Sequence, residues 1–158
     1  MCRLRNRLWP ILCLLAVGTG CNHGRVYHSY QPVGPDGWDR TDTLVFQLPH
    51  MPDSMAMLDL SLCLRIFPQL WWRQVAVGVE YRLSRPDTLF RDTVLVTLSD
   101  SAGSRSLARN PLQQYRHPMA SFSADRLQGA RLRVFHLMRS ETLPRVSDVG
   151  IRVERRQD

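Results

Sequence analysis

The chain has 158 residues and a formal net charge of +7, from 21 basic and 14 acidic residues, and all of the 21 are arginines. This length suits one domain with a single hydrophobic core. The arginines mostly alternate with apolar residues along the chain, which favours a solvated strand face over a nucleic-acid-binding surface.

The N-terminal segment has the pattern of a secretory signal peptide. Arginines within the first seven residues precede an apolar run over 8–17, and small residues at 18–20 precede Cys21. The apolar run is shorter than the stretch of about 20 residues that a membrane-spanning helix needs. A cysteine directly after small residues is typical of a bacterial lipoprotein, in which the thiol is acylated and the chain is cut before the cysteine. We therefore expect a signal peptide over 1–20 and a lipidated tether over 21–25; secretion without a lipid is the alternative.

The clearest periodic pattern lies in residues 55–67. Large apolar residues hold the alternate positions, namely Leu58, Leu60, Leu62, Leu64 and Ile66. This period of two predicts a strand with one apolar and one wet face, which is typical of an antiparallel sheet. Similar patterns predict further strands over 26–30, 43–48, 75–83, 93–99, 131–138 and 149–153.

The segments between these strands carry turn and loop signals. Residues 31–39 are rich in proline, glycine and aspartate, and two prolines interrupt 105–118, which we expect to be irregular. Residues 119–127 suit either a strand or one helical turn, and 140–148 are expected to form a loop. Together these elements predict an all-β fold, an antiparallel β-sandwich of about seven to eight strands that forms a single domain over 26–158.

No recognisable catalytic motif is present. The sequence lacks the common signatures of serine hydrolases, zinc proteases, dithiol oxidoreductases and phosphate-binding loops. The five histidines do not have the spacing of metal ligands. Asp36, Asp39 and Asp42 lie near glycines as in a calcium loop, but turns made by aspartate side chains are the simpler interpretation. We expect no catalytic residue, no metal and no cofactor, and we interpret Cys63 as a small residue on a sheet face rather than a reactive thiol.

Three tryptophans are the best candidates for contact with a partner. Trp71 and Trp72 are adjacent, and neighbouring side chains of an extended segment point to opposite faces. One ring is then exposed, unless the connection curls so that both rings cover the end of the sandwich. Exposed tryptophan is a frequent anchor for proteins or glycans. Trp38 is a further candidate contact, although a position in the core suits it better.

Three segments of the chain resemble a known family. They are Gly34–Pro49 (GPDGWDRTDTLVFQLP), Gln114–Pro118 (QYRHP) and Leu143–Val153 (LPRVSDVGIRV). Together with Cys21 and Val26–Tyr30 (VYHSY), they are similar in sequence and order to the GldH gliding-motility lipoproteins of Bacteroidetes. The resemblance implies a lipid-anchored envelope protein, with acyl chains such as palmitate on Cys21, that is associated with gliding motility and type IX secretion. It implies no catalytic residue.

We therefore expect a non-enzymatic lipoprotein that is anchored to membrane lipid through Cys21, docks onto other envelope proteins and binds no nucleic acid. The expected location is the cell envelope, on the periplasmic side of the outer membrane. One alternative is a lipid-anchored glycan-binding module that uses the three tryptophans. Another is a hydrolase whose site combines Asp59, Glu80 and a histidine.

Overall fold

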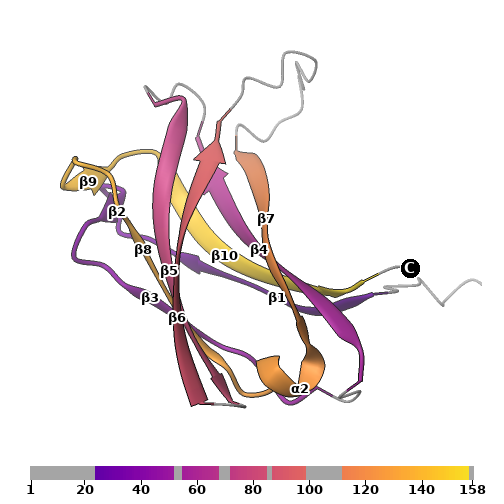
Figure 1. The fold of residues 1–158 in the computed structure, drawn as a ribbon. Helices are drawn as coiled ribbons and strands as arrows, with labels where there is room; N and C mark the ends of the chain where they lie inside the picture. Colours follow the sequence, from indigo (N-terminus) through magenta and orange to yellow (C-terminus); the bar gives the residue numbers. More distant parts are fainter. Residues whose placement is uncertain (1–23, 52–54, 68–71, 85–86, 99–111, 157–158) are drawn as a thin grey trace, which may run out of the picture.

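Two four-stranded antiparallel sheets form the body of the protein (Figure 1). The computed structural model describes residues 24–51, 55–67, 72–84, 87–98 and 112–156. In spatial order, the first sheet contains β1 (Arg25–Pro32), β10 (Val146–Arg155), β4 (Met57–Ile66) and β7 (Gln113–Ser123). The second contains β3 (Leu44–Gln47), β8 (Arg131–His136), β5 (Gln74–Ser84) and β6 (Asp87–Thr97). The short strands β2 (Trp38–Asp39) and β9 (Thr142–Leu143) pair with each other, and α2 (Ala124–Leu127) is a single helical turn.

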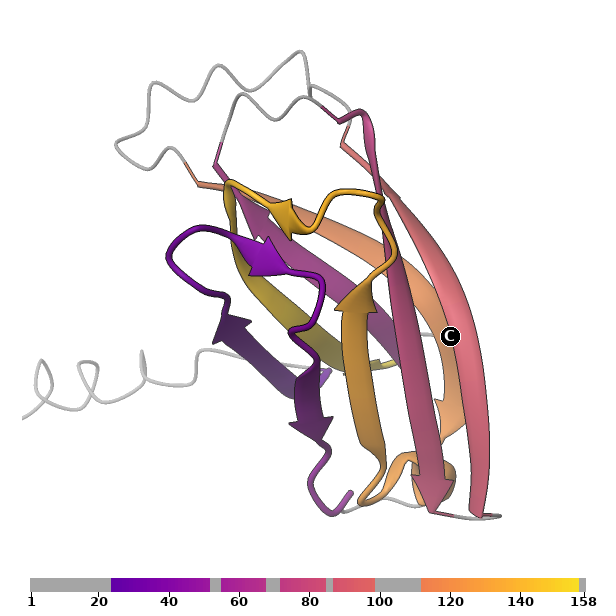
Figure 2. The ribbon, with the colours of Figure 1, turned by 90° about the vertical axis from the view of Figure 1, so that its left-hand side faces the viewer.

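The two four-stranded sheets are the layers of a sandwich. Figure 2 shows the second sheet in front of the first. Every strand pairing within the sheets is antiparallel. The predicted all-β antiparallel sandwich is therefore confirmed.

The core lies between the sheets, where alternation directs the apolar side chains. The five apolar residues predicted to share one face of β4 are each at most 2% exposed: Leu58, Leu60, Leu62, Leu64 and Ile66. On β5 of the other sheet the corresponding residues are at most 1% exposed: Val75, Val77, Val79 and Leu83. Burial of each such side chain contributes about 1.5–3 kcal/mol to the free energy of folding.

The expectation of an irregular segment up to Pro118 is wrong where β7 begins. β7 pairs with β4 along its length, and the register shifts between Leu60 and Ser61 of β4. Pro118 is accommodated because β7 is an edge strand and the proline lies at this irregularity. Edges and bulges are the places where a strand tolerates proline. Residues 119–127 combine both predicted possibilities, with a strand as far as Ser123 and then one helical turn.

Several strands extend beyond the segments in which side chains alternate. β6 starts at Asp87, whereas the pattern predicted a strand from residue 93, because the β5–β6 hairpin stays paired from Ser84–Asp87 to Gln74–Thr97. The loop expected over 140–148 instead contains β9 and the start of β10. Backbone pairing with a neighbouring strand thus continues where the alternating pattern stops.

The predicted signal peptide over 1–20 and the predicted lipid attachment site Cys21 lie outside the described residues, and β1 begins at Arg25. In the described part of the chain, no helix has the length and apolar character needed to cross a bilayer.

Candidate functional site

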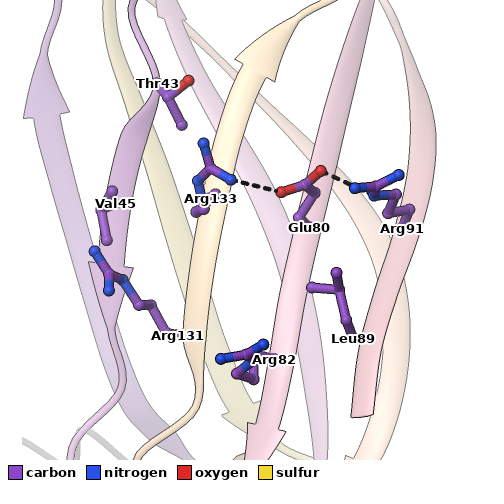
Figure 3. Close-up of a pocket in the computed structure, with 8 residues that line it drawn as sticks. All are labelled: Thr43, Val45, Glu80, Arg82, Leu89, Arg91, Arg131 and Arg133. Carbon is purple, nitrogen blue, oxygen red and sulfur yellow. Dashed lines mark hydrogen bonds and ion pairs between the residues drawn. The ribbon is translucent and has the colours of Figure 1, made fainter.

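An open groove lined by arginines lies on the outer face of the second sheet (Figure 3). It has a volume of about 600 Å³ and is lined by Thr43, Val45, Glu80, Arg82, Leu89, Arg91, Arg131 and Arg133. Four arginines and one glutamate give this lining a formal excess of three positive charges. We call this feature the arginine groove.

The groove follows from the alternation of side chains along β5 and β8. The inward positions of both strands hold buried apolar residues, among them Val79 and Leu83 of β5 and Leu132 and Val134 of β8. The charged residues between them therefore point out of the sandwich. The sheet thus buries one face in the core and presents a charged face to solvent.

Glu80 joins two arginines at the middle of the groove. It lies directly opposite Arg133 on β8 and Arg91 on β6. Oε2 of Glu80 is 2.9 Å from an Nη of Arg133, and Oε1 is 2.9 Å from Nε of Arg91. The glutamate side chain is 12% exposed, while those of Arg91 and Arg133 are 74% and 53% exposed. The carboxylate therefore orients two guanidinium groups at the rim of the groove.

A second part of the groove contains two arginines on neighbouring strands. Arg82 and Arg131 are cross-strand partners in β5 and β8. On their other sides, Arg82 is paired with Leu89 of β6 and Arg131 is paired with Gln47 of β3. An anionic ligand in the groove can accept planar, paired hydrogen bonds from either guanidinium group.

Trp38 lies in the core and has no exposed surface. Its side chain is 0% exposed, its Nε1 donates a hydrogen bond to the Asp42 carbonyl at 3.1 Å, and its ring lies edge-on to His136 at 5.5 Å. The prediction that Trp38 contacts a partner or a glycan is therefore wrong, and the expectation of a core position is confirmed.

The other two tryptophans give little support to a glycan site. Trp72 is half-buried and packs against the core, and Trp71 lies outside the described residues. Sugar-binding sites usually present an open aromatic face. A contact through Trp71 or Trp72 remains a prediction.

The residues suggested for a hydrolase do not come together. Asp59 points outward from the first sheet, where it accepts a hydrogen bond from Ser121 at 2.5 Å and lies 3.2 Å from Arg156. Glu80 points outward from the second sheet, on the opposite side of the sandwich. The hypothesis of a hydrolase site that combines these two carboxylates is therefore wrong.

Cys63 is covered by a neighbouring aromatic ring. It lies on the outer side of β4 opposite Gly150, whose own partner on β1 is Tyr30, and its exposure is 0%. Burial raises the pKa of the Cys63 thiol and raises the pKa of Tyr30 to about 12. A thiol of this kind is a poor nucleophile, in keeping with its interpretation as a small structural residue.

Two of the segments that carry the family resemblance meet at one corner of the fold. Gly37 has a φ of +117°, and a Cβ there would lie 2.3 Å from the Leu143 carbonyl oxygen. The next residue, Trp38, pairs with Leu143 between β2 and β9. Asp39 accepts hydrogen bonds from the Thr41 hydroxyl at 2.6 Å and its amide at 2.8 Å, which lower the pKa of Asp39 and form the turn expected from the sequence. These motifs therefore build this corner of the fold.

The sequence analysis did not single out the arginine groove. It interpreted arginines between apolar residues as a solvated strand face, which describes Arg131 and Arg133 correctly but does not show which charges lie side by side. The available signal was the recurrence of arginine at outward positions of two predicted strands, 75–83 and 131–138. Only the strand register turns that recurrence into a site.

Comparison with known proteins identifies the family. No curated protein matches the chain. A model of the family described as GldH lipoprotein matches residues 25–153, which covers almost the whole sandwich, its arginine groove and the corner formed by β2 and β9. The chain therefore belongs to the GldH lipoprotein family.

Proposed function

We propose that this protein is a non-enzymatic docking component, and that its arginine groove binds an acidic segment of another envelope protein. Membership of the GldH lipoprotein family makes it a membrane-anchored lipoprotein of the cell envelope that is associated with gliding motility. The observation that carries the proposal is the lining of the groove, whose described residues include four arginines and one glutamate, a formal excess of three positive charges. The partner that we propose belongs to the gliding and type IX secretion machinery.

The proposed anchor is an acylated Cys21, which holds the domain at the periplasmic side of the outer membrane. One acyl chain gives only reversible binding, whereas two or more give stable attachment. A protein attached in this way meets its partners at the membrane surface and needs only a complementary surface to retain them.

The shape of the groove favours an extended acidic peptide over a single small anion. Its lining residues come from four adjacent strands, and Val45 and Leu89 lie among the arginines (Figure 3). An acidic segment supplies carboxylates for the guanidinium groups and aliphatic stems for the two apolar residues. Charge complementarity of this kind gives selectivity and rapid association.

The test measures binding of a fluorescent oligoglutamate peptide to the intact lipoprotein in mild detergent. The double variant Arg82→Ala/Arg131→Ala is expected to bind at least about tenfold more weakly, because each charged hydrogen bond that is lost contributes about 1.5 kcal/mol or more. The matched control is Arg40→Ala/Arg139→Ala, which removes two exposed arginines that do not line the groove. Wild-type affinity is expected for the control.

Two results would overturn the proposal. One is equal peptide binding by the wild type and the Arg82→Ala/Arg131→Ala variant. The other is strong binding of pyrophosphate at these arginines with no binding of the peptide, which would assign the groove to a phosphate ligand. Photo-crosslinking from position 89 in cells then identifies the natural partner, which is expected to contact the groove through an acidic segment.

A further inference from the structure

One end of the first sheet gathers exposed methionines and arginines beside the start of β1. The Arg155 amide donates to the Gly24 carbonyl at 2.7 Å, and the Arg156 amide donates to the Met57 carbonyl at 2.9 Å. The start of β1, the end of β10 and the start of β4 are therefore three neighbouring strand ends. In Figure 1 they lie at the right, beside the mark for the C terminus.

The side chains at this end combine apolar and basic character. Met55 is 89% exposed and Met57 is 42% exposed. Methionine is usually buried, so two exposed methionines so close in the chain are unusual. Arg25 and Arg155 are exposed, and the side chain of Arg156 is 47% exposed. We call Arg25, Met55, Met57, Arg155 and Arg156 the anchor-side surface.

The length of the proposed tether restricts where this surface can lie. Only residues 22 and 23 separate Cys21 from Gly24, so an extended chain between Cys21 and Gly24 spans at most about 11 Å. An acylated Cys21 has its acyl chains in the bilayer and its backbone at the headgroups. Gly24 is thereby held close to the headgroups, together with the strand ends that are hydrogen-bonded beside it.

We propose that the anchor-side surface is a membrane-contact surface, in which Met55 and Met57 enter the headgroup region and the three arginines bind phosphates of anionic lipid. The proposal rests on the anchor at Cys21 given in the proposed function. Apolar side chains flanked by basic residues are the composition that binds an anionic membrane interface. Asp59 lies 3.2 Å from Arg156, so part of the charge of this arginine is already balanced within the protein. Arg25 and Arg155 are exposed and add to the attraction.

This orientation leaves the arginine groove accessible. Figure 2 is viewed from the left-hand side of Figure 1 and shows the second sheet in front, so the outer face of that sheet is turned away from the anchor-side surface. A bilayer in contact with the anchor-side surface would not cover the groove. The two surfaces can thus be occupied at the same time.

The test places a fluorophore on the intact, acylated lipoprotein in vesicles of phosphatidylethanolamine and phosphatidylglycerol. Met57→Cys carries an environment-sensitive dye on the anchor-side surface. Leu95→Cys, at a position that is 52% exposed on β6, is the matched control. Cys63 is 0% exposed and escapes labelling in the folded protein. Both substitutions are at exposed positions, and equal thermal unfolding of the two labelled proteins confirms that they fold alike.

The dye at position 57 is expected to shift to shorter emission wavelength and to be quenched at least about twofold by lipids that carry a quencher near the headgroup. The dye at position 95 is expected to show neither change. Arg25→Glu/Arg155→Glu is expected to reduce the quenching at position 57 on these vesicles. Equal quenching at positions 57 and 95 on protein that resists a high-salt wash would overturn this inference alone. Protein that carries no acyl chain and washes off would overturn the proposed anchor and this inference together.

Discussion

Replacement of Glu80 by glutamine should affect stability and ligand binding in opposite directions. The carboxylate forms ion pairs with Arg91 and Arg133, each at 2.9 Å, and both arginine side chains are more than half exposed. Exposed pairs of this kind contribute about 0.2–1 kcal/mol each, so their loss is expected to lower the free energy of unfolding by about 1 kcal/mol. Glutamine keeps the volume and one acceptor, so packing changes little. The melting temperature is expected to fall by about 4 °C.

The same substitution removes the one negative charge among the described residues that line the groove. The formal excess of positive charge then rises from three to four, and an acidic peptide is expected to bind several-fold more tightly. Urea denaturation at low and high salt measures the stability, and fluorescence anisotropy measures the peptide affinity. Because salt screens exposed ion pairs, the stability difference between wild type and Glu80→Gln is expected to shrink at high salt.

Glu154→Gln is the matched control on the opposite sheet. Glu154 also joins two arginines, Arg116 and Arg152, but it does not line the groove. Burial opposes its ionisation, but hydrogen bonds to Arg152 and Arg116 and their charges outweigh this effect and lower the pKa of Glu154. This contribution to stability is present above the ordinary carboxyl pKa and is lost as the pH falls below it. We expect Glu154→Gln to lower stability by a similar amount without changing peptide affinity. Tighter peptide binding by Glu154→Gln, or weaker binding by Glu80→Gln, would refute the reasoning.

Three further predictions concern buried positions. Gly150→Ala is expected to cost about 1–3 kcal/mol in urea denaturation, because its Cβ would lie 2.6 Å from the Tyr30 ring and 2.9 Å from the Ser29 carbonyl oxygen of β1. Gly78→Ala is expected to cost less, because the atoms nearest its Cβ belong to the Phe135 side chain, which can shift. Burial lowers the pKa of His136, so the unfolded chain binds a proton more readily than the folded protein does. The free energy of unfolding of the wild type is therefore expected to fall between about pH 7 and pH 5, by less than about 1.4 kcal/mol per pH unit. His136→Leu is expected to reduce this slope. A thiol reagent is expected to modify Cys63 only as fast as the protein unfolds, and rapid labelling under native conditions would contradict its burial.

The strands that the sequence predicts best are those that bury one face against the opposite sheet. β4 and β5 alternate regularly because their inward residues pack together across the core. The side-chain pattern of each strand therefore indicates which of its faces is buried. β7 does not show this pattern, because it is an edge strand that contains Pro118 and polar residues on both faces. β7 is held in place by backbone pairing with β4. Any side chain that causes no steric conflict is compatible with such pairing. Local sequence therefore carries little information about it.

The arginine groove was harder to predict for a related reason. Alternation correctly indicates that Arg82 and Arg131 face solvent, but a shift of one residue in the pairing of β5 and β8 would separate them. The register is fixed by the packing of the opposite, apolar face. The charge pattern of the outer face is thus a consequence of how the core packs.

The segments that reveal the family and the residues that form the groove are largely different parts of the chain. Gly37 is required by its close approach to the Leu143 backbone, so substitution of Gly37 disrupts the corner made by β2 and β9. Glu80, Arg82 and Arg131 lie outside those segments, on strands whose stability comes from the inward face. Outer-face residues of such a sheet can change at a cost of about 1 kcal/mol or less, whereas the corner cannot. Family membership is therefore compatible with different groove charges, and the charge of the groove in each member should match the segment that it binds.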